Sequence, residues 1–187
     1  MSSFFQNEGP IRQKSIVYLV KKWINLSNMS INKFKIEEEV SGKSTKLIFS
    51  GNLNEHAVLS VPKHCDQLSI ISINLRDVSY INSVGTRSWC VWIKKIPSTT
   101  QIIFEECPML FVKAFSYVSG FLPNHAIVNS FYVPYVSEDS EESKIVLYRR
   151  GEHYDESGQL KVVSVLDSSG KAMELDVLNK YFAFLKR

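Results

Sequence analysis

The sequence has few of the features that place a protein in a membrane, outside the cell or on nucleic acid. No apolar run approaches the roughly 20 residues that a membrane-spanning helix needs, so we expect no membrane span. A net charge of +3 is weak for a protein that binds DNA or RNA, which concentrates many more lysines and arginines. The N-terminus lacks the basic start, apolar core and small-residue cleavage site of a secretory signal peptide.

Cysteine is also scarce. Cys65, Cys90 and Cys107 show no paired spacing that would indicate a disulfide framework or a metal site. Reduced thiols fit this pattern best, and such thiols are typical of the cytoplasm. We therefore expect a cytoplasmic protein.

Motifs of common enzyme mechanisms are missing as well. The chain has no glycine-rich phosphate loop, no His-Glu-x-x-His and no Gly-x-Ser-x-Gly. His56 and His64 could approach Cys65 as a nucleophile–base pair, but proximity in sequence does not supply the geometry. We expect a protein that is not an enzyme and has no cofactor, with a small hydrolase or transferase as the alternative.

The composition is that of an ordinary soluble globular protein, with 44% hydrophobic and 22% charged residues. The 187 residues fit one domain or two small ones. The patterns divide the chain into an N-terminal extension (1–32), a central domain (33–136) and a C-terminal tail (137–187).

The N-terminal extension contains a broad amphipathic stripe, which predicts a helix. Its apolar positions are Ile16, Val17, Leu19, Val20, Trp23, Ile24 and Leu26. Only three lysines, Lys14, Lys21 and Lys22, lie on the polar side, which is few for stable membrane binding. We favour a helix packed on the same subunit or on a dimer mate over a helix that binds a partner or a membrane surface.

The central domain alternates strand and helix patterns. Residues 33–53 read as a β-hairpin, and the segment 54–67, which contains Pro62, predicts only a reduced or irregular helix. A strand at 101–104 precedes a helix whose apolar positions are Phe111, Ala114, Phe115 and Val118. The residues from 126 to 133 then predict an edge strand. This order is typical of an α/β sandwich with helices laid on a mixed sheet.

The most informative segment runs from residue 68 to residue 96. A β-rich apolar strand at 69–75 is followed by a turn and by a helix with one apolar face, formed by Trp89, Trp92, Ile93 and Ile96. Ser83 is placed as the N-cap of this helix, beside unpaired backbone N–H groups that favour a phosphate. A simple helix cap explains the residue type without any signalling role, and we favour it over regulated phosphorylation, which stays open as the second interpretation.

This segment resembles the STAS domains of bacterial anti-sigma-factor antagonists, whose signature is a strand, an Asp-Ser-Ser-Gly-like turn and a helix. Ser83 matches the family's phosphorylated serine and Gly85 its glycine, whereas Asn82 replaces an aspartate and Val84 a second serine. The corner Gly51-Asn52-Leu53-Asn54 matches the family's Gly-x-Leu/Ile-Asp corner.

The resemblance covers roughly residues 33–136. It implies that an anti-sigma-like kinase or another signalling protein binds the surface around Ser83, under possible control by phosphorylation. The partner-binding residues that it implies are Asn52, Asn54, Asn82, Ser83, Val84, Gly85 and Arg87. The alternative is a structural or self-assembling module, such as a homodimer, without a switch.

The tail predicts two strands, at 144–149 and 160–166, and a final helix with Val177, Leu178, Tyr181, Phe182 and Leu185. It resembles the small zinc ribbon appended to some bacterial STAS-like proteins. The four cysteine positions of that ribbon are occupied by Ser137, Ser140, Leu166 and Ser169, and neither serine nor leucine supplies the thiolate that zinc prefers.

We therefore expect a degenerate, metal-free ribbon that is stabilised by packing instead of by zinc. The candidate packing residues are Met173, Tyr181, Phe182, Phe184 and Leu185. In fold class, the sequence as a whole predicts an α/β protein with a small β-rich C-terminal region that ends in a helix.

Overall fold

The computed structural model describes residues 32–161, 163–178 and 180–186. The chain separates into two units, Met1–Asn32 and Lys33–Arg187, and all elements named below belong to the second. The helix predicted from the apolar stripe between residues 16 and 26 lies outside the described residues. No helix of the described ranges is both long and apolar enough to cross a membrane.

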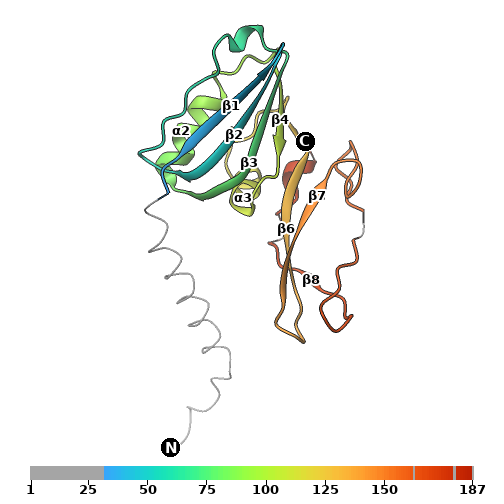
Figure 1. Cartoon of the computed structure of the whole chain (residues 1–187). Coiled ribbons are helices and arrows are strands. Elements are labelled where there is room, and N and C mark those ends of the chain that lie inside the picture. Colours follow the sequence, from blue (N-terminus) through green and yellow to red (C-terminus); the bar gives the residue numbers. More distant parts are fainter. Residues whose placement is uncertain (1–31, 162, 179, 187) are drawn as a thin grey trace, which may run out of the picture. The chain divides into compact units, whose positions relative to one another are not determined.

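A mixed sheet forms the framework of the unit (Figure 1). β1 (Lys35–Ser41) and β2 (Ser44–Leu53) make the predicted antiparallel hairpin. β3 (Ile70–Ile81), β4 (Gln101–Glu105) and β5 (Ile127–Val128) then add in parallel. Within the described residues the sheet has five strands in the order β1-β2-β3-β4-β5.

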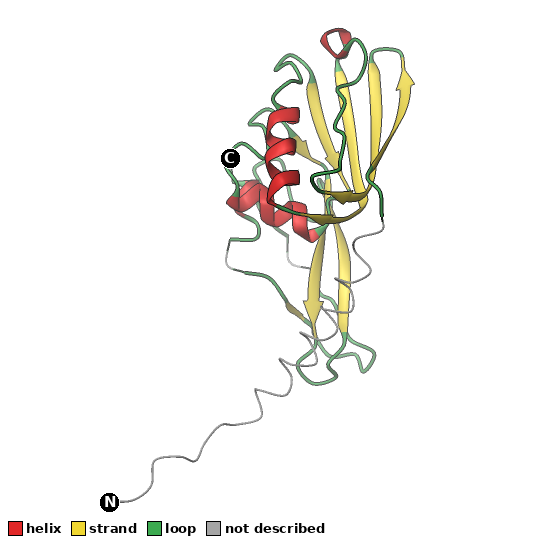
Figure 2. Ribbon diagram, turned by 90° about the vertical axis from the view of Figure 1, so that its left-hand side faces the viewer, coloured by secondary structure: helices red, strands yellow, loops and turns green. Residues whose placement is uncertain are grey.

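The two α-helices of the described residues, α2 (Ser83–Ile93) and α3 (Met109–Tyr117), lie on the same side of this sheet (Figure 2). Alternate residues of the central strands point toward them and are buried, as the period of two in a strand requires. These residues are Leu47, Phe49, Ile71, Ile73, Leu75, Ile102 and Phe104. The predicted α/β class, with helices packed on a mixed sheet, is confirmed at this level.

The core between the helices and the sheet is rich in aromatic side chains, and Trp89 lies at its centre. Its ring is 5.9 Å from that of Phe49, 5.0 Å from that of Phe111 and 5.4 Å from that of Phe121, measured between ring centroids. The indole Nε1–H donates to the carbonyl oxygen of Phe121 at 2.8 Å. The predicted apolar face of α2 is confirmed, because Trp89, Trp92 and Ile93 are all buried.

Between β2 and β3 the chain forms an irregular loop whose only helical element in the described residues is the short 3-10 helix η1 (Cys65–Gln67). This agrees with the reduced helix expected around Pro62. The loop lies alongside α2, because the indole Nε1–H of Trp92 donates to the carbonyl of Ser60 at 2.9 Å.

The predicted edge strand at 126–133 is wrong as a single element. Its first part is β5, whereas the second part is β6 (Ser130–Val136), the central strand of another sheet. β6 pairs with β7 (Ser143–Arg149) and with β8 (Glu174–Leu175), both antiparallel. The chain changes sheets because the backbone of Cys107, beyond the end of β4, pairs with residues 130 and 132.

Two other predictions for the tail are wrong. The described residues of 160–166 form no strand and make only isolated bridges, at Leu160 and Leu166. In place of the final helix, the described residues form turns and the 3-10 helix η2 (Ala183–Leu185). The apolar spacing in these segments does not match burial, because Tyr181 is buried whereas Leu166 and Leu178 are exposed.

The tail shares its core with the helices and with β6. The ring of Phe184 lies 5.8 Å from that of Phe115 in α3 and 5.1 Å from that of Phe131 in β6. The hydroxyl of Ser116 donates to the carbonyl of Tyr181 at 3.0 Å, and the hydroxyl of Tyr181 donates to the carbonyl of Tyr132 at 2.7 Å. Of the predicted packing residues, Met173, Tyr181 and Phe184 are buried, while Phe182 and Leu185 are half-buried.

This packing predicts that the tail and the sheet unfold together. Replacing Phe184 with alanine removes a buried ring of the tail that packs against α3 and β6, and should lower the free energy of unfolding by about 3–5 kcal/mol in one cooperative transition. Leu178→Ala is the matched control, because that side chain is 64% exposed, and should change stability by less than about 0.5 kcal/mol. Denaturant unfolding followed by circular dichroism and by tryptophan fluorescence measures both. Two separate transitions in the wild type would contradict the shared core.

Candidate functional site

The predicted site forms where two parallel strands end at the same edge of the sheet. The register pairs Asn52 with Tyr80 and Leu53 with Ile81, so β2 and β3 finish side by side. The backbone N–H of Asn82 donates to the carbonyl of Leu53 at 3.3 Å. The corner at 51–54 and the turn at 82–85, which are about 30 residues apart in sequence, are therefore adjacent, as the resemblance implied.

The N-cap of α2 is Asn82 and not Ser83, so the sequence-based assignment of the cap to Ser83 is wrong. The side-chain Oδ1 of Asn82 accepts from the backbone N–H of Gly85 at 2.8 Å, and its carbonyl accepts from the N–H of Thr86 at 2.8 Å. β3 runs six residues further than the predicted strand end at 75, to Ile81, and the helix starts directly after Asn82. Ser83 is thus the first residue inside the helix, with its side chain exposed.

Only glycine fits at position 85, because the backbone of β2 lies too close for a side chain. A Cβ atom at this position would lie 1.9 Å from the carbonyl oxygen of Leu53, far inside van der Waals contact. The first turn of α2 is pressed directly against the end of β2, and only a residue without a side chain allows this approach. The turn that carries Ser83 is therefore held against the sheet.

Glu55 is a member of the site that the sequence did not reveal. The amide Nδ2 of Asn82 donates to Oε2 of Glu55 at 2.7 Å, which ties the loop after β2 to the helix start. The pKa of Glu55 is lowered, first by a hydrogen bond from its own backbone N–H and then by the Asn82 amide. No local motif marks Glu55, because its partner lies 27 residues away.

The implied partner-binding residues fall into two groups. Asn52 and Gly85 are buried and the cap residue Asn82 is half-buried; Asn52 is 1% exposed, and its Oδ1 accepts from the hydroxyl of Ser79 at 3.0 Å. Ser83, Val84 and Arg87 are exposed, while the side chain of Asn54 is half-buried and accepts from the N–H of His56. The first group supports the turn, and the second forms the surface that another molecule can reach.

The tail contains a second polar cluster, centred on Asp167. Three of the four positions assigned to lost metal ligands converge on this carboxylate. Oδ2 accepts from the hydroxyls of Ser137 at 2.8 Å and Ser140 at 3.0 Å, and Oδ1 accepts from the hydroxyl of Ser169 at 2.7 Å. The fourth position, Leu166, is half exposed and carries no polar group. Hydrogen bonds from these hydroxyls to the Asp167 carboxylate therefore join the loop at 137–140 to the loop at 167–171.

The turn that contains Asp167 occurs twice in the tail. In Asp167-Ser168-Ser169-Gly170-Lys171, the carboxylate accepts from the N–H and hydroxyl of Ser169 and from the N–H of Lys171. In Asp155-Glu156-Ser157-Gly158-Gln159, the corresponding three donors act on Asp155. The repeated Asp-x-Ser-Gly is a signal in the sequence that could have identified both turns. Only Asp167 also receives the hydroxyls of Ser137 and Ser140.

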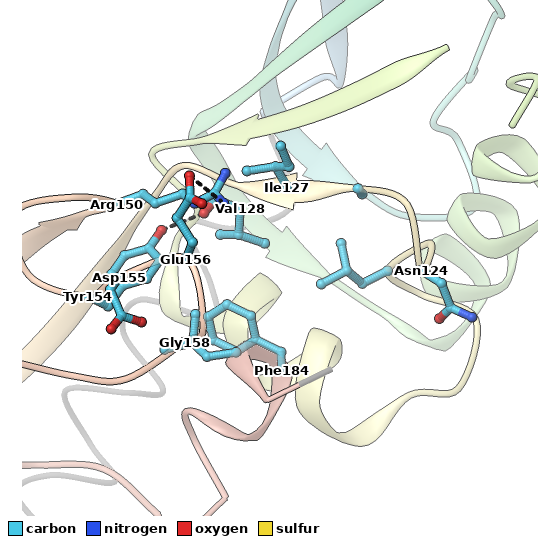
Figure 3. Close-up of a pocket in the computed structure, with 12 residues that line it drawn as sticks. Asn124, Ile127, Val128, Arg150, Tyr154, Asp155, Glu156, Gly158 and Phe184 are labelled. Atoms are coloured by element: carbon cyan, nitrogen blue, oxygen red, sulfur yellow. Dashed lines mark hydrogen bonds and ion pairs between the residues drawn. The ribbon is translucent and has the colours of Figure 1, made fainter. Parts of the chain in front are cut away.

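A small cavity lies between β5 and the tail (Figure 3). Its volume is about 150 Å³, smaller than the roughly 300–1,000 Å³ of typical ligand pockets. Arg150 and Glu156 form an ion pair of 3.5 Å at its edge, and the hydroxyl of Tyr154 donates to the carbonyl of Val128. Because Arg150 and Glu156 are paired with each other and the space is small, this cavity is a packing junction with room for water-sized groups.

Nucleophilic and metal-binding groups are not assembled elsewhere in the described ranges. Within them, no three His, Cys, Asp or Glu side chains are close enough to hold a metal ion. No hydrogen bond joins His56 or His64 to the thiol of Cys65 among these residues. Burial raises the pKa of the Cys107 thiol well above its usual value, which favours the unreactive protonated form.

A scan of the sequence against protein-family models finds no match, and a search against curated proteins also finds none.

The cap assignment gives a direct test of the site's geometry. Asn82→Ala removes the acceptor for the Gly85 N–H and should lower the free energy of unfolding by about 1 kcal/mol. Ser83→Ala, one position away and exposed, should change it by less than about 0.5 kcal/mol. Denaturant titration of both variants measures the difference. The reverse order of effects would return the cap to Ser83.

Asp167 should make the stability of the protein depend on acid pH. Hydrogen bonds, first from the Ser169 hydroxyl and then from the Lys171 N–H and the Ser137 hydroxyl, hold the pKa of Asp167 well below its usual value. A carboxyl whose pKa is depressed by folding stabilises the folded state above its unfolded pKa of about 3.9, and this contribution is lost as the pH falls. The difference in unfolding free energy between wild type and Asp167→Asn should therefore shrink between about pH 6 and pH 3.

Asp155→Asn is the matched control for this experiment, because Asp155 makes the same turn without the two additional hydroxyls. At pH 6 it should destabilise the protein less than Asp167→Asn does. Equal effects of the two variants would show that the Ser137 and Ser140 hydrogen bonds contribute nothing measurable.

Proposed function

We propose that this chain is a non-catalytic, STAS-like bacterial signalling module that acts in the cytoplasm and binds a protein partner through the start of α2. The observation that carries the proposal is an exposed serine in the first turn of α2, whose start is held in place by contacts with the end of β2 and the loop after it. Gly85 is in contact with the end of β2, and Asn82 is bonded to both Gly85 and Glu55. A partner would meet a preformed surface, which lowers the entropy cost of binding.

Exposed apolar side chains extend this surface along the helix. Val84 is 47% exposed and Val91 is 55% exposed. Together with exposed Arg87, they are spaced at i, i+3 and i+7, which places them on one side of α2. Arg87 can supply both charge and contact area to a partner, and the two valines add exposed apolar surface beside it.

A phosphate on Ser83 would change the charge of this surface strongly. It would add about −1.5 to −2 charges at the N-terminal end of the helix, where the backbone dipole favours an anion. The carboxylate of Glu55 lies nearby through its hydrogen bond to Asn82, so the added charge would repel it. A partner that recognises the unmodified surface would meet an altered loop and an altered potential.

The proposal is tested by affinity capture from native lysate with three baits: wild type, Ser83→Glu and Ser41→Glu. Ser41 is an exposed serine at the opposite end of the sheet, so the control introduces the same charge away from the site. We expect mass spectrometry to identify a partner that wild type and Ser41→Glu retain and Ser83→Glu loses. With purified partner, the dissociation constant should rise at least about tenfold for Ser83→Glu only.

Three outcomes separate the alternatives. Retention of the same partner by all three baits would leave a binding module in which the turn is only structural. A second copy of the chain as the captured protein, with a concentration-independent dimer mass, would favour self-assembly. If no bait retains a partner at any salt concentration, the binding proposal fails.

A further inference from the structure

A groove with no assigned role lies at the other end of α2 from Ser83. It has a volume of about 590 Å³, within the range of roughly 300–1,000 Å³ that is typical of small-molecule sites. One wall is the end of α2 and the loop that leads to β4, and the other is the loop 119–125 after α3. α2 has 11 residues, so the groove and the Ser83 turn are about 16 Å apart along the helix.

The walls of the groove are fixed by hydrogen bonds. The Trp89 indole donates to the carbonyl of Phe121, which joins the second wall to α2. The side chain of Gln101 in β4 donates to the carbonyl of His125 at 2.7 Å, which joins the same wall to the sheet. The backbone of Lys95 is held by the carbonyl of Trp92 at 2.9 Å. The groove is therefore preformed, as binding sites for small molecules usually are.

The charged side chains that line the groove are all basic. Its charged or titratable lining residues are Lys94, Lys95 and His125, and no carboxylate lines it. In the described part of the chain, neither lysine forms an ion pair within 4.0 Å, whereas Lys144 and Lys171 in the tail each contact an acidic side chain. The aliphatic end and Nζ of Lys94 lie close to the position that a Cβ of Gly120 would occupy, at 3.6 and 3.8 Å. Lys94 thus reaches across to the opposite wall.

The floor is apolar. Ile93, Ile96 and Leu122 line the groove with small exposed fractions, and Pro97 and Pro123 stand on the two sides. A cation-rimmed groove over an apolar floor favours a ligand with an apolar body and an anionic group. The two lysines of one wall and the histidine of the other supply hydrogen-bond donors for an anionic group.

A simpler explanation accounts for part of this arrangement. Lysines just after the last turn of a helix interact favourably with the partial negative charge of its C-terminus. This explains the presence of Lys94 and Lys95, but it does not explain a preformed groove, an apolar floor or a histidine on the facing wall.

We propose that this groove binds a small organic phosphate ester with one apolar or aromatic group, with the phosphate held by Lys94, Lys95 and His125. The apolar group would lie on Ile93, Ile96 and Leu122. This site is independent of the proposed partner surface at Ser83, because none of the residues around that turn lines the groove.

The experiment uses the full chain labelled with ¹⁵N and phenyl phosphate as the probe, at pH 7 and low salt. We expect shifts of amide signals confined to residues 93–98 and 119–125, with saturable binding. Lys94→Ala combined with Lys95→Ala should raise the dissociation constant at least tenfold. Phenol lacks the charge and inorganic phosphate lacks the apolar group, so each should bind at least tenfold more weakly than phenyl phosphate.

Lys43→Ala combined with Lys46→Ala is the matched control, because it removes two lysines from the β1–β2 hairpin and none from the groove. It should leave the dissociation constant unchanged. The melting temperatures of both double variants verify that they are folded. Shifts spread over the whole surface, equal weakening by the two double variants, or equal binding of inorganic phosphate and phenyl phosphate would each overturn the proposal.

Discussion

The contact of the Trp89 indole with the loop after α3 is the interaction on which the remaining structure depends. Its ring packs against aromatic rings from β2, β4 and α3, and its N–H is satisfied by the carbonyl of Phe121. A buried indole needs such a partner, since an unpaired polar group in the core costs about 1–3 kcal/mol. Together with Trp92 and Ile93, this residue packs α2 on the sheet, with the Ser83 turn at one end of the helix and the basic groove at the other.

The tail depends on a different kind of contact. A buried aromatic cluster around Phe131 and Phe184 joins it to β6 and to α3. Its outer loops are joined by hydrogen bonds to the single carboxylate of Asp167, which accepts from two loops that are 30 residues apart. An ionised carboxylate can accept several hydrogen bonds at once and is a stronger acceptor than a neutral group. It therefore provides a polar centre for loops that have little regular secondary structure.

Prediction succeeded where burial of one face of a strand or helix produces both the periodic sequence pattern and the regular backbone. The hairpin at 33–53 and the face formed by Trp89, Trp92 and Ile93 were identified because alternation and helical spacing come directly from burial on one side. Prediction failed at 160–166 and in the last helix, where the apolar spacing does not match the burial, since Leu166 and Leu178 are exposed. The cap was misplaced by one residue, because Asn82 and Ser83 are both good capping residues and the end of β3 decides between them.

The sequence by itself determined the class of the fold and the buried face of α2, and both follow from hydrophobic period. The nearness of the 51–54 corner to the 82–85 turn was implied only by the family resemblance, and the structure shows it because β2 and β3 are parallel and end side by side. Only the tertiary structure decided that Glu55 supports Asn82, that Ser137, Ser140 and Ser169 meet at Asp167, and that a basic groove lies beyond Lys94. Each of these joins side chains or loops far apart along the chain, and such a contact leaves no local periodic signal in the residues that make it.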